Sequence, residues 1–595
     1  MYLVSEAYQQ QMKQTLRNVS YIKIQFGLVD PDATTNAYIA STSTKVPFAI
    51  DPELMDLYNV PRWYNTLETN FWLLDGTLDL LPATSPDVYQ GYVSQQLSSE
   101  TGDYNSAVEF VIKFYQGVYA FRGLTFIFDT IQNNYPTEIE ITGYLNKVQN
   151  FTTTVTINSS EFTLERDIPT IGSFVDQLVI KCSKNKLPNR RLRIQDIILG
   201  VIKKISSDTL TASTWKRAND QMNTVLPSNE FSFTFYDTNN EYNPDNPEGI
   251  WEYLDRGQSI DFSYGYELNN GTVEWIPGST LYTDGTPSVL NSGALSEVTF
   301  NAISRLQMLT DTYDESIFYE QGETLYNIAK MLLNWSGLEE PYFQLNDGLK
   351  NWYFYGYIPS MEVRQLLQLI ANAGMCLLEI DRNGYIIFAD RPTEPTDFTY
   401  SLDDVYDSSP AINKYPYLKN LSVAVNNYTV ESEVSEIATV EISGANNTEM
   451  TVEYSAATSV TITASDGATL NSVIKVCAQK AVVNVSGTGK ITIQGKLINI
   501  SSSTISKNFN TVGEDCALTN EFICTNTHAS AYLEWMGVIL NKRNVYTFDD
   551  RGFPEIDTSD RIGVDTLFTE GKRVIVTQSE IQYNGALSGS TEVLG

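Results

Sequence analysis

Side chains suited to acid–base or nucleophilic chemistry are scarce in this sequence. Histidine occurs once among 595 residues, at His528, so a Ser-His-Asp or Cys-His nucleophile would have to use it. A zinc peptidase motif of the HExxH type needs two histidines and is excluded. His528 opens the segment 528–540, which we interpret as a strand, and a structural histidine is the simpler interpretation.

Other catalytic motifs give no firmer candidate. The sequence has no GxxxxGK[ST] loop and no GxGxxG after a predicted strand, so nucleotide hydrolysis and dinucleotide chemistry have no support. A glycosidase needs two carboxyl groups about 5 to 10 Å apart, and among 72 Asp and Glu residues the sequence singles out no pair. We therefore predict that the protein is not an enzyme and has no catalytic residue and no cofactor.

A polar loop at 237–246 is the best candidate for a metal site. Asp237, Asn239, Asn243 and Asp245 supply oxygen donors, and calcium takes about six to eight of them. The EF-hand spacing and its closing bidentate Glu are absent, however, and Asn, Asp and Pro are ordinary turn residues. We predict a turn here and no metal site.

The cysteines form no CxxC pair and have mostly apolar neighbours. They are Cys182, Cys376, Cys477, Cys516 and Cys524. We expect reduced, partly buried thiols, as in a protein made in a bacterial cytoplasm.

The net charge of −33 argues against specific nucleic-acid binding, which needs clustered Lys and Arg. The acidic surface serves either solubility or a channel lining past which DNA can slide. The basic run at 183–193 lacks interleaved aromatic residues and more plausibly pairs with acidic neighbours. Arg190, Arg191 and Arg193 alternate around Leu192, so we expect at least one to face inward and to be paired.

The elements that must position these side chains are predicted to be mainly β. Apolar residues make up 42% of the chain and aromatic residues 12%, which is enough for buried cores. Abundant Val, Ile, Thr, Tyr and Phe with regularly spaced turn residues favour strands. The first 14 residues lack the apolar region of a secretory signal, and no window approaches about 18 consecutive apolar residues, so we expect no signal peptide and no membrane span.

The length predicts roughly four domains, and the pattern divides the chain into successive units. The predicted units are an N-terminal segment at 1–50 with an amphipathic start and a strand at 19–30, a β unit at 51–204, a β unit at 205–312, a helical α+β unit at 313–399, a β unit formed by 400–438 and 508–595, and an inserted small sandwich or set of barrel hairpins at 439–507.

Only the fourth unit is predicted to be clearly helical. One apolar stripe runs along 322–337 and another along 360–374, with Ser360 as N-cap and Gly374 past the end. The second helix leads into a hairpin that turns at 381–384. Both stripes are most simply core.

The two ends of the chain resemble one family. LETNFWLLDGTLDLLP at 67–82 and YNGALSGSTEVLG at 583–595 resemble segments of tail-tip and baseplate proteins from phages and prophages of Gram-positive bacteria. The 205–312 unit, with its RGQ turn and A-x-S-R-L strand, resembles the first barrel of the VgrG-like hub fold. The run 560–592, with a turn at Glu570 and Gly571, resembles the second barrel.

The strand order of 51–204, closing on RRLRIQDIILG, resembles discoidin-like jelly rolls. The helix pair and its hairpin resemble the insert of hub proteins. The resemblance thus implies a mainly β, multidomain protein with a discoidin-like β-sandwich, two hub-type β-barrels and a small α+β insert.

The same resemblance implies a structural virion protein of the phage tail tip. It would form a homotrimeric baseplate hub ring whose two barrels per copy match a hexameric tube. Its expected partners are the tail tube or distal tail protein, the tape-measure protein, and spike or fibre proteins.

An alternative is a tail adhesin that attaches to host cell-wall glycan through the discoidin-like domain. Sugars stack on exposed rings, and the candidate loop aromatics are Trp63, Tyr64, Trp72 and Tyr135. The same rings could instead fill the sandwich core or an interface. A wall hydrolase, the third class, would require one specific acid pair.

Overall fold

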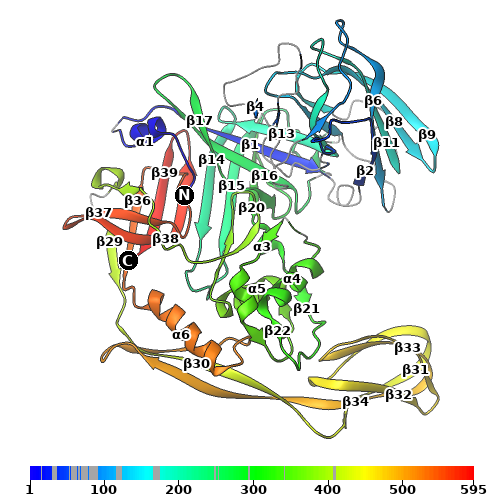
Figure 1. Ribbon diagram of the computed structural model, residues 1–595, viewed down its shortest axis with the longest axis vertical. Helices are drawn as coiled ribbons and strands as arrows, with labels where there is room; N and C mark the ends of the chain where they lie inside the picture. Colours follow the sequence, from blue (N-terminus) through cyan, green and yellow to red (C-terminus); the bar gives the residue numbers. More distant parts are fainter. Residues whose placement is uncertain are drawn as a thin grey trace.

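A computed structural model describes most of the chain. The described residues are 1–14, 16–29, 37–52, 54, 63–64, 68, 78–79, 91–115, 123–164, 175–246, 249–251, 254–292, 295–338, 340, 342–406 and 410–595. As predicted, the protein is mainly β and multidomain, with strands in several separate sheets (Figure 1). No helix in the described ranges is long and apolar enough to cross a membrane.

The largest sheet has fifteen strands and combines the early, middle and late parts of the chain. Its main path runs β13-β1-β16-β18-β20-β15-β14-β38-β39-β36-β29, with β17, β19, β28 and β37 paired beside it. The strands are β1 (Ser20–Val29), β13 (Gly200–Ser206), β14 (Leu210–Ala218), β15 (Ser228–Asp237), β16 (Ser259–Glu267), β17 (Val273–Pro277), β18 (Leu281–Thr283), β19 (Ser288–Ser292), β20 (Leu295–Ile303), β28 (Thr399–Tyr400), β29 (Ala411–Lys414), β36 (Asn544–Asp550), β37 (Arg561–Thr566), β38 (Thr569–Tyr583) and β39 (Leu587–Leu594).

The pairing of β14 with β38 joins the two predicted hub-type units into this one sheet. The strands are antiparallel, with register from Ser213 opposite Tyr583 to Ala218 opposite Gln578. In Figure 1 the cyan-green strands of the first unit therefore continue into the red strands of the last. The two sets of strands are not separate bodies.

An aromatic core lies beneath β14, β15 and β20. Alternate residues of β15 are buried, as the period of a half-buried strand requires. Phe231 stacks on Phe262 with ring centroids 3.8 Å apart, and Phe233 stacks on Phe300 at 5.3 Å. Each buried Phe contributes about 2 to 3 kcal/mol of transfer free energy.

A sandwich of one four-stranded sheet (β10-β7-β12-β5) and one five-stranded sheet (β2-β6-β11-β8-β9) forms a second body. The strands are β2 (Ala37–Thr42), β5 (Tyr92–Val93), β6 (Asp103–Phe114), β7 (Leu124–Phe128), β8 (Pro136–Leu145), β9 (Val148–Thr156), β10 (Glu161–Leu164), β11 (Gln177–Asn185) and β12 (Arg193–Ile198); β3 (Trp63–Tyr64) and β4 (Leu78–Asp79) form a parallel pair apart from these sheets. The segment 1–50 is shared, because β1 lies in the large sheet and β2 in the sandwich.

The inward-facing arginine predicted from the basic run is Arg193. Its guanidinium lies 2.8 Å from the carboxylate of Glu68, and both side chains are fully buried. Glu68 also accepts the backbone N–H of Arg191 at 2.5 Å. On the sandwich surface, Lys184 of the same run lies 3.6 Å from Asp103. The basic run thus pairs with acidic neighbours, as expected.

The helical unit has both predicted helices, α4 (Leu325–Trp335) and α5 (Val363–Ala373). The predicted N-cap of α5 at Ser360 is wrong, because the cap is Glu362. Met361 and Glu362 pair in an extended conformation with Tyr313 and Thr312, so the helix can begin only after them. The hairpin of β26 (Leu377–Ile380) and β27 (Ile386–Ala389) follows as predicted.

Short elements complete this unit and its borders. They are α3 (Arg305–Met308), β21 (Thr312–Tyr313), β22 (Glu323–Thr324), β23 (Phe343–Gln344), η2 (Asp347–Asn351), β24 (Tyr353–Phe354), β25 (Met361–Glu362) and η3 (Leu402–Asp404).

The segment 528–540, predicted as a strand, is a helix, α6 (Asn526–Leu540). The Thr525 side chain caps it by accepting the His528 N–H, and its buried residues follow a helical spacing. Gly537 allows close packing, since a Cβ there would lie 2.2 Å from the Phe509 ring. The prediction of a single clearly helical unit is therefore wrong, and α1 (Glu6–Met12) adds the amphipathic start that was expected.

The turn between β37 and β38 lies at Leu567 and Phe568, not at Glu570 and Gly571 as predicted. The Thr566 hydroxyl accepts the N–H groups of Phe568 and Thr569 and closes this tighter turn.

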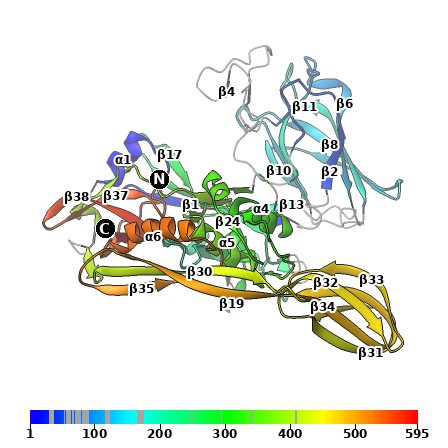
Figure 2. The ribbon, with the colours of Figure 1, turned by 60° about the horizontal axis from the view of Figure 1, so that its bottom comes forward.

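A long arm projects from the large sheet (Figures 1 and 2). Its strands are β30 (Leu418–Val430), β31 (Ser435–Glu453), β32 (Ala457–Ser465), β33 (Ala468–Val476), β34 (Lys480–Asn508) and β35 (Glu514–Leu518). At its tip, residues 480–487 of β34 pair with β31 and β33, and residues 489–497 pair with β31 and β32, giving two small three-stranded layers. The last part of β34 pairs with β30, so this one strand runs through both the tip and the part of the arm next to the body.

Replacing Glu68 by Gln should destabilise the sandwich by about 3 to 5 kcal/mol, because Arg193 would keep a buried charge without its counter-charge. Urea unfolding of the full chain, with the transition assigned by amide exchange in β6 and β11, measures this. Lys181→Gln is the matched control, since its partners are exposed and it should cost less than about 0.5 kcal/mol. A Glu68→Gln cost below about 1 kcal/mol would contradict the expectation.

Candidate functional site

His528 is a packing residue in the first turn of α6. Its Nε2 lies 2.8 Å from the Ala373 carbonyl oxygen, and its ring stacks on Trp352 with centroids 4.6 Å apart. Burial lowers the pKa of His528, which favours a neutral ring whose Nε2–H donates to Ala373. The ring therefore joins α6 to the end of α5.

The 237–246 loop directs its oxygens to its own backbone. The Asp237 carboxylate accepts the N–H groups of Tyr242 at 2.8 Å and of Asn239 at 3.3 Å. The Asn243 side-chain oxygen accepts the N–H of Asp245 at 3.0 Å. These are turn contacts, and within the described ranges no cluster of three His, Cys, Asp or Glu residues could hold a metal.

All five cysteines are free, and Cys182, Cys376 and Cys477 are buried. Burial raises the pKa of Cys182 to about 12 and that of Cys524 to about 11. A thiol with a raised pKa is a poor nucleophile at neutral pH.

The four candidate glycan-binding aromatics are described unequally. Trp63 and Tyr64 form β3, of which the backbone is described, and Trp72 lies outside the described residues. Tyr135 is 8% exposed, donates its hydroxyl to the Asn158 carbonyl at 2.8 Å, and has the Lys186 ammonium 4.5 Å from its ring centroid. Its ring is enclosed by the sandwich.

An ion cluster that the sequence did not predict lies where three units meet. The Asp557 carboxylate lies 2.8 Å from Arg217 of β14 and 2.7 Å from Arg382 of the β26–β27 turn. The amino group of Met1 reaches Asp560 at 2.6 Å. Burial alone would raise the pKa of Asp557, but Arg382 and Arg217 outweigh it and hold the pKa below its usual range.

Glu379 and Asp557 line a cavity of about 340 Å³ beside this cluster. Burial raises the pKa of Glu379 to about 7, a value suited to a general acid. Asp557 is held by two guanidinium groups, and Glu379 accepts a hydrogen bond from the Asn219 amide at 3.0 Å. These contacts connect the hairpin, β14 and the 557–560 loop, which is a structural role.

A second set of buried groups anchors α1. Glu555 is 2% exposed and accepts the Tyr8 hydroxyl at 3.1 Å. Burial raises the pKa of Glu555 to about 7. Nearby, Asp550 accepts the Thr591 hydroxyl at 2.6 Å, and burial raises its pKa to about 6.

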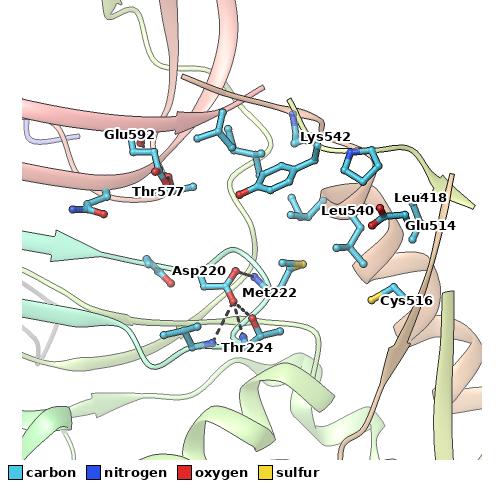
Figure 3. A pocket seen from close by; sticks show the side chains of 18 of the residues that line it. Asp220, Met222, Thr224, Leu418, Glu514, Cys516, Leu540, Lys542, Thr577 and Glu592 are labelled. Atoms are coloured by element: carbon cyan, nitrogen blue, oxygen red, sulfur yellow. Dashed lines mark hydrogen bonds between the residues drawn. The ribbon is translucent and has the colours of Figure 1, made fainter. Parts of the chain in front are cut away.

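An open groove of about 890 Å³ lies between the large sheet and the base of the arm (Figure 3). It is lined by the 218–226 loop, residues 415–418 and 514–517, the end of α6, and parts of β38 and β39.

Two sets of hydrogen bonds lie among the polar side chains of this groove. The Asp220 carboxylate accepts the N–H groups of Thr224 at 2.7 Å and Met222 at 3.1 Å, as Figure 3 shows. Thr577 donates to Glu592 at 2.9 Å. Cys516 also lines the groove, and burial raises the pKa of its thiol. No nucleophile–base pair lies among the described lining residues.

Asp557→Asn should lower the free energy of unfolding by about 2 kcal/mol, because Arg217 and Arg382 would lose their counter-charge. The value is below that of a fully buried pair, since the Asp557 side chain is 31% exposed. Urea unfolding followed by tryptophan fluorescence suits the test, because Arg217 lies 3.7 Å from the Trp215 ring. Asp347→Asn, whose partner Lys350 is exposed, should change stability by less than about 0.5 kcal/mol. Equal effects of the two substitutions would refute the role of the cluster.

Glu555→Gln should flatten the dependence of stability on pH. The folded chain holds the Glu555 proton up to about pH 7, whereas the unfolded chain loses it near 4.5, so the wild-type free energy of unfolding falls as pH rises between these values. The variant should therefore gain about 2 to 3 kcal/mol relative to wild type between about pH 4.5 and pH 8. Chemical denaturation across this range, with exposed Glu449→Gln as control, measures the gain. Parallel pH profiles for wild type and Glu555→Gln would contradict it.

Comparison with known proteins finds similar solved structures at low sequence identity. No family model matches the chain, and no curated protein matches it. The 43 kDa tail protein of prophage MuSo2 from Shewanella oneidensis is 11% identical, with 66% of this chain and 95% of that chain covered and a TM-score of 0.38. The tail protein from Neisseria meningitidis MC58 is 9% identical, with 66% and 94% covered and a TM-score of 0.37.

Prophage tail protein gp18 from Listeria monocytogenes EGD-e is 8% identical, with 66% and 91% covered and a TM-score of 0.36. The chain is thus similar to phage and prophage tail proteins over about two thirds of its length, at identities and TM-scores too low to establish a family.

Proposed function

We propose that the chain is a structural protein of a phage tail tip and forms a homotrimeric baseplate hub ring. The ring closes the tail tube and connects it to the distal tail, tape-measure, and spike or fibre proteins. The protein would accordingly reside in the virion. The observation that carries the proposal is the continuous sheet, in which the segments resembling two hub barrels join through β14 and β38.

The chemistry of the described side chains supports an assembly role. The single histidine packs α6 on α5, and the perturbed carboxyl groups anchor element junctions. The net charge of −33 suits a passage through which DNA moves without being bound. These features favour a scaffold over a catalyst.

The alternative, host-glycan binding by the 51–204 sandwich, would need exposed rings at one end of that domain. Tyr135 is buried and its face is occupied by Lys186. We therefore favour the ring, and test binding to host cell walls alongside ring formation.

The test is the mass and symmetry of the full-length chain. We expect a closed threefold ring in class-averaged electron micrographs and a light-scattering mass of three times 66.8 kDa, about 200 kDa. Because a hub can require its tube to assemble, tail particles from the strain that carries the gene are examined as well, with antibody labelling at the tip.

A monomer that is also absent from particles would overturn the proposal. Retention of that monomer by purified host cell walls would then favour the adhesin.

A further inference from the structure

The edge strand β29 carries an exposed mixed surface at one end of the large sheet. Among the described strands β29 pairs with β36 alone, so its other backbone edge is unpaired within the described ranges, and all four of its residues are exposed. Ile412, Tyr415 and Tyr417 are 55%, 57% and 48% exposed. Free edges and exposed aromatic groups are features of protein interfaces.

Cations gather beside β29 without acidic partners. They are Lys542, Arg543, Arg561, Lys572 and Arg573, and none of them makes an ion pair with the described part of the chain. Burial, and then Arg561 and Lys572, lower the pKa of Lys542, so these charges repel one another. These cations stand out in a chain that has 72 acidic residues and a net charge of −33.

Side-chain contacts connect these cations to the edge strand. The Arg543 guanidinium lies 3.5 Å from the Tyr417 ring centroid and donates to the Tyr415 carbonyl at 3.0 Å. The Lys572 ammonium donates to the Tyr546 hydroxyl, and Tyr546 is the register partner of Ile412. We name β29, Tyr415, Tyr417 and the five cations the β29 surface.

The hairpin tip next to this surface is apolar. Leu567 is 65% exposed and Phe568 is 96% exposed. Lys572 lies opposite Val564 in the same hairpin, which places a cation within a few residues of the tip. An apolar tip with adjacent cations fits an acidic partner that also offers apolar side chains.

The arm root offers that complement. Glu431, Glu433 and Glu436 are exposed and make no ion pair with described residues, and Val434 and Ile500 between and beside them are 55% and 51% exposed. We name these five residues the arm root. Glu431 directly follows β30 and Glu436 lies at the start of β31, so these residues are at the end of β30 remote from β29.

We propose that the arm root of one copy binds the β29 surface of the next copy. The two patches differ, so the contact is head to tail, and repetition about an axis closes a ring. This inference rests on the proposed ring and names the surfaces that form it. Nucleic acid is a poorer occupant, because the groove beside β29 also presents Glu514, Asp515 and Glu592.

The test is a charge swap in the full chain. Lys572→Glu with Arg573→Glu, or Glu433→Lys with Glu436→Lys, should each weaken self-association about tenfold or more in sedimentation velocity, and combining all four should restore it to within about threefold. Glu449→Lys with Glu453→Lys changes the net charge by the same amount, but at the arm tip, and should leave self-association unchanged. Circular dichroism and Tm confirm that each variant is folded.

A zero-length carbodiimide cross-link between Lys572 and Glu433, detected in mixed isotope-labelled chains or in intact particles, gives a second readout. If the ring forms equally well with either pair of charge reversals, or if combining all four does not restore it, the inference is overturned and the hub proposal still stands. Binding of Lys572 and Arg573 to phosphatidylglycerol vesicles, with no such cross-link in particles, assigns the surface to a membrane and also overturns it. A monomer absent from particles refutes both proposals.

Discussion

The pairing of β14 with β38 is the constraint on which the rest of the structure depends. It brings residues 213–218 against residues 578–583, more than 350 positions later, with Trp215 and Arg217 facing Ile581 and Ser579. Closing so long a loop costs conformational entropy, and contacts of such separation form slowly. The ion cluster around Asp557 lies beside this seam and fastens the β26–β27 turn to it. Strand pairing and charge pairing thus stabilise the same junction.

The helical unit and the arm both lie between β14 and β38 in the sequence. The helical unit follows the first set of strands and rests on α6 through His528 and the buried Asn372, whose side-chain oxygen accepts hydrogen bonds from Tyr532 and Asn520. The arm leaves the body through β30 and returns through β34, so its tip can project without disturbing the sheet. Lys475 and Lys480 pair with Glu315 and Asp314 and fix the tip to the helical unit. These ion pairs hold the arm in one direction relative to the helical unit.

Local periodicity was enough to predict most strands, both central helices and the hairpin at 381–384, because each is determined by its own alternation or stripe. It was misleading for α6, where aromatic and β-branched residues suggested a strand while the Thr525 cap and the packing at Gly537 select a helix. The N-cap of α5 was missed because a two-residue bridge to Thr312 and Tyr313 determines it. The ion cluster joins residues 165 and 340 positions from Arg217, and no spacing in a single sequence predicts such a contact.

The distribution of charge has a physical consequence for assembly. Several basic side chains in the body pair with acidic residues of the same chain, as Arg193, Arg217 and Arg382 do. Burial, and then Arg561 and Lys572, lower the pKa of Lys542, so these three cations repel one another. A contact between such a surface and a complementary part of another copy exists only in the assembly. It therefore stabilises the assembly relative to the monomer and favours association without any change of fold. In the proposed assembly these cations would gain acidic partners that they lack in the described part of the single chain.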